Sequence, residues 1–284
     1  MSDTAFLDAC RTFDVPLEGA VQVADTPGSR VWKVTLTDGT PAALKVPRPD
    51  KAASERPAGA MLRYWQGDGA ARIIAGSDGP LLIEWLEGPS LGDQGRAGDL
   101  ASADQTLAHG AAGLQGRPGA PWADLPTLDV WCHALLTFDL RRVSPDAALW
   151  FEAAARLAED LIASTPSTVP LHGDLHHDNI IVTDRGPLAF DPKGLMGDPA
   201  YEPANAFRNP RGVEGPLTDP VRIDALAQAA AEAMDVPYQR VIGWAAVKSA
   251  LSLAWSLTGT LAEADDHEYR VLAALGRSAR RHFG

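Results

Sequence analysis

The chain has 284 residues, of which 45% are apolar and 22% are charged. These fractions are typical of a folded globular protein, and at roughly 150 residues per domain the length fits two lobes or one large domain. The 25 basic and 37 acidic residues give a net charge of −12, which disfavours nucleic acid as a partner because its phosphate backbone would be repelled.

The first predicted elements in the chain are β-strands. Apolar and polar residues alternate over 30–37, and the Asp-Gly pair that follows predicts a hairpin turn to a return strand over 41–46. A helix is predicted over 54–65, with Ser54 as its cap and Pro57 in its first turn. The beginning of the chain is therefore expected to form a small antiparallel sheet with one helix.

A further strand is predicted over 80–86, and the Glu-Gly-Pro sequence after it marks a boundary between two lobes. We expect an N-terminal lobe over 1–86 and a C-terminal lobe over 88–284, with the hinge near 84–87.

The second lobe is predicted to be mostly helical, because segments rich in alanine and leucine recur there with helical periodicity. They lie at 99–114, 127–143, 146–163, 219–234, 238–262 and 266–282. Residues 92–98 and 116–121 are predicted loops. A short β-hairpin over 179–191 is the exception among the helices.

The richest polar cluster in the chain lies at the mouth of this hairpin. Asn179 stands at the entrance of the hairpin, Asp191 at its exit, and Asp174 in the loop before it. Two carboxylates and an amide oxygen then converge, and such oxygen ligands suit Mg²⁺. The interval of five residues between Asp174 and Asn179 matches the D-x-x-x-x-N spacing of kinase catalytic loops, which indicates phosphoryl transfer.

The segment His172–Asn179 resembles the H-G-D-x-x-x-x-N motif of aminoglycoside phosphotransferases and related small-molecule kinases. The continuation over 190–197, with Ala204-Asn205 and Asn209-Pro210, is similar to the streptomycin 6-phosphotransferase and hydroxyurea-resistance kinase branch. The resemblance runs from about residue 20 to 260. It implies an α+β, protein-kinase-like fold of two lobes, with a small antiparallel-sheet N-lobe containing one helix and a larger, mostly helical C-lobe.

The resemblance also implies roles for the residues that match its motifs, with ATP and Mg²⁺ as cofactors. Asp174 would be the catalytic base or would orient the acceptor hydroxyl, and Asn179 and Asp191 would be the magnesium ligands. Lys45 would contact the α- and β-phosphates, with Glu55 as its ion-pair partner.

Three further residues would contact the nucleotide if the resemblance holds. The backbone carbonyl of Glu84 and the N–H of Leu86 would bind adenine at the hinge. Ser29 would contact phosphate from the loop over 26–30, which has one glycine where protein kinases have several.

The acceptor is expected to be a small cationic molecule, since the proposed site is rich in acidic residues whose mutual repulsion a positive ligand would offset. We expect Asp198, Glu202, Asp265 and Asp266 to be near it. For the acids over 263–268 the alternative is a solvated helix junction.

The sequence leaves several functions open. The first is phosphorylation of a streptomycin-type aminoglycoside, and the second is a metabolic kinase for a sugar, amino alcohol or hydroxyurea-like compound. A metallophosphoesterase is a third possibility, although its upstream D-x-H and downstream G-N-H segments are missing. A pseudokinase binding module is a fourth, and the joint presence of Lys45, Asp174, Asn179 and Asp191 argues against it.

A cytoplasmic location without membrane contact is expected from the sequence. No apolar run reaches the ~20 residues of a membrane span, and the beginning of the chain lacks the pattern of a signal peptide. Cys10 and Cys132 are far apart and fit reduced thiols.

Overall fold

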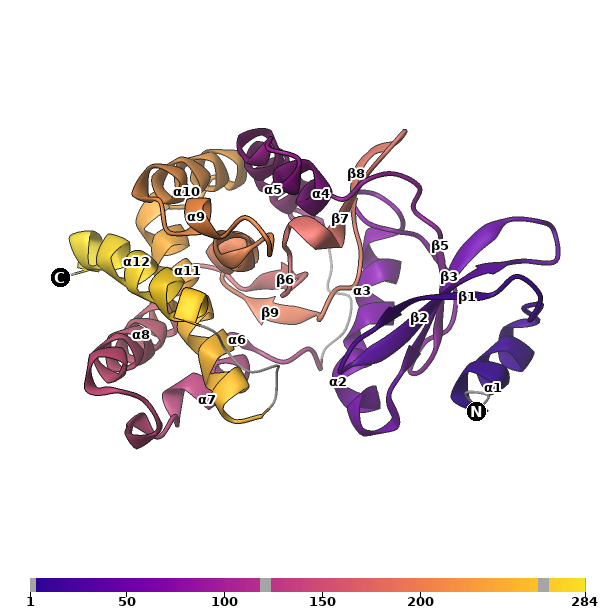
Figure 1. Ribbon diagram of the computed structural model, residues 1–284, viewed down its shortest axis with the longest axis horizontal. Coiled ribbons are helices and arrows are strands. Elements are labelled where there is room, and N and C mark those ends of the chain that lie inside the picture. The colour runs from indigo at the N-terminus through magenta and orange to yellow at the C-terminus, as the bar shows by residue number, and fades with distance from the viewer. Residues whose placement is uncertain (1–3, 118–123, 260–265, 284) are drawn as a thin grey trace.

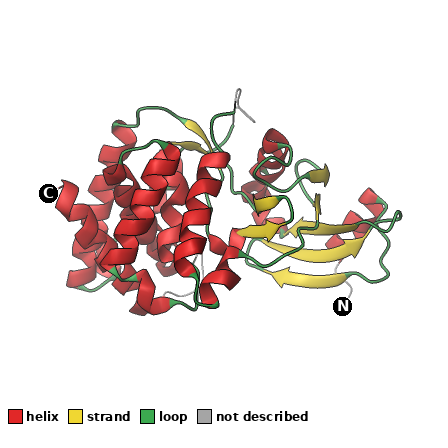
Figure 2. Cartoon of the chain, turned by 90° about the horizontal axis from the view of Figure 1, so that it is seen from above, coloured by secondary structure: helices red, strands yellow, loops and turns green. Residues whose placement is uncertain are grey.

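An antiparallel sheet forms one end of the molecule and a group of helices forms the other, as Figures 1 and 2 show. The computed structural model describes residues 4–117, 124–259 and 266–283. The sheet has the strand order β1-β2-β3-β5-β4. Its strands are β1 (Val21–Asp25), β2 (Ser29–Thr35), β3 (Pro41–Pro47), β4 (Ile73–Ala75) and β5 (Leu81–Glu84).

The hairpin of β2 and β3 confirms the prediction from the alternating sequence. Trp32 and Val34 of β2 are buried together with Leu44 of β3 in a small core of their own. Helix α1 (Thr4–Phe13), which the sequence analysis did not predict, covers this core, and its Phe6 stacks on Trp32 with ring centroids 4.5 Å apart.

The predicted helix over 54–65 is broken in two. A 3-10 turn, η1 (Pro49–Lys51), leads into α2 (Ala52–Glu55), and α3 (Pro57–Trp65) follows after Arg56. Ser54 is not the cap, because it lies inside α2 and its hydroxyl donates to the carbonyl of Lys51 at 2.9 Å. The break falls where Pro57 cannot donate a backbone N–H, and it leaves Glu55 buried at the end of α2.

Helix α3 belongs to the core of the helical end. Its Met61, Leu62 and Trp65 are fully buried, in one hydrophobic cluster with residues of the C-terminal lobe. The Trp65 indole donates to the carbonyl of Leu114 at 2.9 Å and stacks on His172. The sheet is thus attached to the helices through α3.

The C-terminal lobe is built around the long helix α11, of which fourteen residues are buried. The other main helices are α4 (Leu91–Arg96), α5 (Leu100–Gly113), α8 (Pro145–Ala163), α10 (Pro220–Met234) and α12 (Asp266–Phe283), with α11 spanning Tyr238–Leu257. None of the helices in the described ranges is both long and apolar enough to span a membrane.

Two predictions for this lobe are wrong. Residues 92–98, predicted as a loop, contain α4, whose start is fixed by reciprocal hydrogen bonds between Ser90 and Asp93. The single helix predicted over 127–143 is instead α6 (Leu128–Trp131), α7 (His133–Leu136) and the turn η2 (Leu140–Arg142). Most of the predicted loop over 116–121 lies outside the described residues.

Two short β-ladders lie among the helices. The predicted hairpin is confirmed as β7 (Ile180–Thr183) and β8 (Gly186–Ala189). A second pair, β6 (Val169–Leu171) with β9 (Leu195–Gly197), is additional. Because β6 runs into the loop before the hairpin and β9 follows the loop after it, the two ladders bring residues 172–179 and 190–194 together between the lobes.

Candidate active site

Hydrogen bonds of His172 hold the loop that carries Asp174 in place. His172 is fully buried, and its Nε2 donates to the carbonyl of Phe190 at 2.9 Å while its Nδ1 accepts from the N–H of Asp174 at 3.3 Å. Burial lowers the pKa of His172 to about 4, so the ring is neutral at pH 7. His172 therefore positions the loop and carries no proton for the reaction.

Glu202 also supports this loop. It lies in the 3-10 helix η4 (Pro199–Arg208), and its carboxylate accepts the backbone N–H of His172 at 2.7 Å and that of Gly173 at 3.2 Å. Burial raises the pKa of Glu202 to about 7, against the effect of these two donors. The side chain is 2% exposed, so the predicted contact of Glu202 with substrate is corrected to a positioning role.

Asp174 is oriented by two amides. The side-chain amide of Asn205 donates to Asp174 Oδ1 at 2.8 Å, and that of Asn179 donates to the Asp174 carbonyl at 3.0 Å. The Asp174 side chain is 26% exposed, so its carboxylate can be reached by a small molecule. A carboxylate placed in this way can accept the hydrogen of a hydroxyl group.

The backbone of the hairpin brings Asn179 and the residue before Asp191 together. The N–H of Phe190 donates to the carbonyl of Asn179 at 3.0 Å, which places Asp191 directly beside it. The side-chain nitrogen of Asn179 donates to the Asp174 carbonyl, so the Oδ1 atom of Asn179 is available to another partner. One amide oxygen and one carboxylate fit Mg²⁺, which binds through few protein oxygens and takes substrate phosphates as further ligands.

A cluster of two lysines and two acids links the lobes beside this pair. Lys45 of β3 contacts the carboxylates of both Glu55 and Asp191, and Lys193 Nζ lies 2.8 Å from Glu55 Oε1. Burial would raise the pKa of Asp191, but Lys45 and Lys193 hold it well below the usual value. Burial also raises the pKa of Glu55, but Lys45 and Lys193 lower it, and the net shift is downward. Both acids are therefore ionised at pH 7.

The loop between β1 and β2 lies over this cluster. A Cβ atom added to Gly28 would come within 2.7 Å of Glu55 Oε1, so only glycine allows this approach. The Thr26 hydroxyl accepts from the N–H of Ser29 at 3.0 Å, and Ser29 is buried in the sheet. The structure thus brings the loop before Ser29 close to Glu55, the partner of Lys45.

The expected hinge residues lie where β5 leaves the sheet. The Glu84 carboxylate accepts the N–H of Arg72 at 2.7 Å and pairs with Arg185, so its side chain is engaged. Leu86 is partly buried against the main core. Residues 85–90 then connect β5 to α4.

Asp198 does not face the cleft. It is 1% exposed and caps η4, with its carboxylate accepting from the N–H of Ala200, from the Trp244 indole at 2.8 Å and from the Arg240 guanidinium. These contacts fill its acceptor positions, so the predicted substrate contact of Asp198 is corrected to a structural role.

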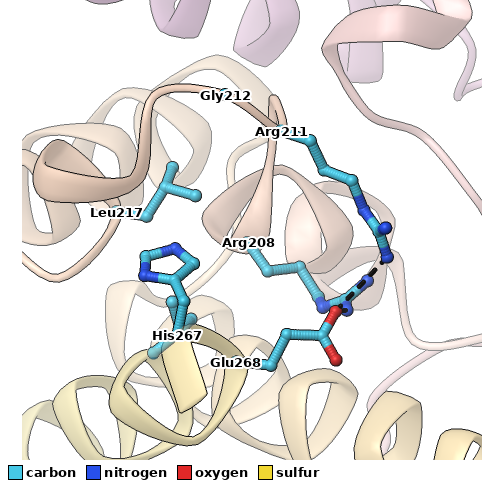
Figure 3. A pocket seen from close by; sticks show the side chains of 7 residues that line it. Arg208, Arg211, Gly212, Leu217, His267 and Glu268 are labelled. Carbon is cyan, nitrogen blue, oxygen red and sulfur yellow. Dashed lines mark hydrogen bonds and ion pairs between the residues drawn. The ribbon is translucent and has the colours of Figure 1, made fainter. Parts of the chain in front are cut away.

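Only one of the two acids expected to contact substrate near residue 265 lies in the described part of the chain. Asp265 lies outside the described residues, and Asp266 is exposed at the start of α12. Glu268 pairs with both Arg208 and Arg211, as Figure 3 shows. With His267 and Leu217 these residues line a pocket of about 110 Å³.

The charge argument for a cationic acceptor also requires correction. Several acids around the site have a basic neighbour of their own in the protein: Asp178 pairs with Arg96 at 2.6 Å, Asp198 with Arg240, and Asp191 with Lys45. Asp174 has Lys248 at 3.9 Å. The charge of these four acids is therefore offset within the protein, and their number alone does not predict the charge of the ligand.

Three residues of the site were missed by the sequence analysis: Lys193, Asn205 and Lys248. The signal for Lys248 is present in the sequence, because it is the one charged residue between Arg240 and Glu263 in an apolar helix. Burial lowers the pKa of Lys248 to about 8, and the carboxylate of Asp174 opposes this effect.

A metallophosphoesterase centre is not supported. The described residues contain no group of three or more His, Cys, Asp or Glu side chains that could hold a metal ion. His176, which the G-D-x-H likeness would use, caps the turn η3 (His177–Asn179), and its Nδ1 accepts from the N–H of Asp178 at 3.3 Å.

The family model for aminoglycoside/hydroxyurea antibiotic resistance kinases matches residues 16–259. The chain belongs to this family. A streptomycin 3''-kinase from Klebsiella pneumoniae is 36% identical over 244 residues, covering 79% of this chain and 83% of the relative. A streptomycin 6-kinase from Streptomyces griseus is 26% identical over 93% of this chain and 86% of the relative.

Solved structures show the same fold. An amicoumacin kinase in complex with AMP-PNP and Ca²⁺ is similar over 99% of this chain and 94% of its own, with a TM-score of 0.66 and 14% identity. The present kinase therefore has the expected α+β two-lobe architecture, and it is a phosphotransferase that acts on a hydroxyl group of a small molecule.

Proposed function

We propose that this kinase uses ATP and Mg²⁺ to phosphorylate a hydroxyl group of a streptomycin-type aminoglycoside. The observation that carries the proposal is the convergence of Asp174, Asn179 and Asp191 with the Lys45–Glu55 pair at one cleft between the lobes. The names of the two streptomycin kinases among its relatives support the choice of acceptor.

Each group in the cleft has a distinct task in direct, in-line transfer. Asp174 accepts the hydrogen of the acceptor hydroxyl and directs its oxygen toward the γ-phosphorus. Lys45, held by Glu55, binds the α- and β-phosphates. Asn179 and Asp191 would hold Mg²⁺, which when bound neutralises charge on the phosphates. Positioning and charge neutralisation lower the barrier, with no covalent intermediate on the protein.

The nucleotide enters between the sheet and the helices. In this proposal the adenine binds to the backbone of Glu84 and Leu86, and Ser29 contacts phosphate from the β1–β2 loop. The location of Ser29 beside the Lys45–Glu55 pair supports the phosphate contact.

The acceptor is proposed to be cationic because streptomycin-type aminoglycosides are, and the relatives act on streptomycin by name. Its positive groups would then lie away from Asp174, near the exposed acids such as Asp266. The alternative is a hydroxyurea-like acceptor, which the family description includes.

The proposal is tested by ATP consumption with streptomycin, hydroxyurea, a hexose and choline as acceptors. Phosphorylation of streptomycin is expected, and Asp174→Asn should lower kcat by about 10²-fold or more because a positioned acid–base group is lost. Asp184→Asn, in the exposed turn of the same hairpin, is the matched control and should behave as the parent enzyme. Near-normal turnover of Asp174→Asn would remove Asp174 from catalysis.

A further inference from the structure

Lys248 is an unusual residue in this fold because it is a buried ammonium with no carboxylate of the described residues within hydrogen-bond distance. It lies in the middle of α11 and is 3% exposed. The nearest carboxylate oxygen, Asp174 Oδ1, is 3.9 Å from its Nζ, which is an ion-pair distance but too long for a hydrogen bond. By contrast, Lys45 contacts two carboxylates.

Asn205 has an unused group at the same place. Its amide nitrogen must face Asp174 Oδ1, since a carboxylate only accepts hydrogen bonds, and the amide oxygen therefore points elsewhere. This Oδ1 is buried and has no hydrogen-bond partner among the described residues. An unpartnered buried acceptor costs free energy unless a ligand satisfies it.

Asn205 and Lys248 both lie next to one carboxylate oxygen. The Asn205 nitrogen is 2.8 Å and the Lys248 nitrogen 3.9 Å from Asp174 Oδ1. The residue that carries the free amide oxygen and the ammonium of Lys248 thus both flank Asp174, whose carboxylate orients the reacting hydroxyl in the proposed mechanism. A second hydroxyl group could accept from Lys248 and donate to Asn205 at the same time.

Two tryptophans complete the surroundings of the ammonium. Lys248 Nζ lies 4.8 Å from the centre of the Trp255 ring and 5.9 Å from that of Trp131. The two rings meet edge to face at 5.0 Å, and both are only partly buried. Flat aromatic walls with a few convergent polar groups are typical of small-molecule sites.

We propose that Lys248 and Asn205 form an acceptor subsite that binds a hydroxyl group adjacent to the one phosphorylated, with Trp131 and Trp255 as its walls. The acceptor should therefore have two neighbouring hydroxyl groups, as polyhydroxylated rings do. A positive group in place of the second hydroxyl would be repelled by the Lys248 ammonium. This inference rests on the proposed kinase function and specifies its acceptor site.

The test is a kinetic comparison with streptomycin and ATP. Lys248→Met should raise the KM for streptomycin roughly 10- to 100-fold, as expected for the loss of a hydrogen bond from a charged group. The KM for ATP should stay within about twofold, since Lys45 and Lys193 adjoin the phosphate side. Lys248→Gln keeps a donor without the charge and should recover part of the affinity. Lys51→Met, on the η1 turn, is the control and should match the parent enzyme.

The adjacent hydroxyl is tested separately. Once NMR has identified the phosphorylated position, an analogue lacking the neighbouring hydroxyl should lose affinity with the parent enzyme but not further with Lys248→Met. Equal effects of Lys248→Met on both acceptors, or an unchanged KM for streptomycin, would overturn the subsite. If the parent enzyme itself leaves streptomycin unmodified, the choice of streptomycin in the proposed function fails instead, and the same comparison is made with whichever acceptor consumes ATP.

Discussion

Replacing Lys248 should make the protein more stable at neutral pH. The ammonium is buried in α11 and its pKa falls from 10.5 to about 8 on folding. At 1.36 kcal/mol per pH unit, keeping it charged costs about 3 kcal/mol of folding free energy at pH 7. Methionine has a similar length and no charge, so Lys248→Met should gain about 2 to 3 kcal/mol of unfolding free energy there.

The gain in unfolding free energy from Lys248→Met should decrease as the pH rises. Between pH 8 and 10.5 the folded parent protein binds fewer protons than the unfolded chain, so its stability rises with pH across this window. The advantage of Lys248→Met should therefore be full below pH 8 and nearly vanish by pH 10.5. Besides Asp174, the groups that act on the pKa of Lys248 are Arg208, Cys132 and Lys193, and all remain in both proteins.

Urea unfolding of the two proteins at pH 7, 9 and 10 measures this difference directly. Lys33→Met is the matched control, because Lys33 also lies over a tryptophan ring, at 4.4 Å from that of Trp85, but is 41% exposed. It should change the unfolding free energy by less than about 0.5 kcal/mol. A less stable Lys248→Met at pH 7, or a difference that does not change with pH, would refute the reasoning.

Two further substitutions separate metal binding from structural roles. Asp191→Ala should abolish Mg²⁺-dependent ATP binding in calorimetric titration, with little change in thermal unfolding because Lys45 keeps its pair with Glu55; unaltered affinity would place the metal elsewhere. Asp198→Asn should lower the unfolding free energy by about 3 kcal/mol in urea titration, since Arg240 loses its buried partner. A raised acceptor KM with unchanged stability would instead restore Asp198 to the substrate site.

The parts of the site that could be predicted are those fixed by local sequence. The catalytic loop and the hairpin after it are continuous in the chain, so the spacing of Asp174, Asn179 and Asp191 determines where they meet. The contacts of Lys193, Asn205 and Lys248 could not be predicted, because they depend on how η4, α2 and α11 pack.

Similar reasons explain the errors in the fold. Helix α4 contains three polar or charged residues and two glycines, so its periodicity is weak, although the reciprocal cap of Ser90 and Asp93 was readable. Asp198 was assigned to the acceptor by its position after the catalytic segment. Its burial depends on Arg240 and Trp244, more than forty residues away, and no local pattern indicates that.

The division of the hydrophobic core has a consequence for motion between the lobes. Helix α3 is packed with the helices, whereas β2, β3 and α1 form a separate core. Strand β5 joins the two cores, because its Leu81 and Ile83 pack in the cluster of α3 while the strand is paired with β3. A displacement of β3 and α2 relative to residues 190–194 would separate Lys45 from Asp191 and Glu55 from Lys193, so these two ion pairs oppose motion between the lobes.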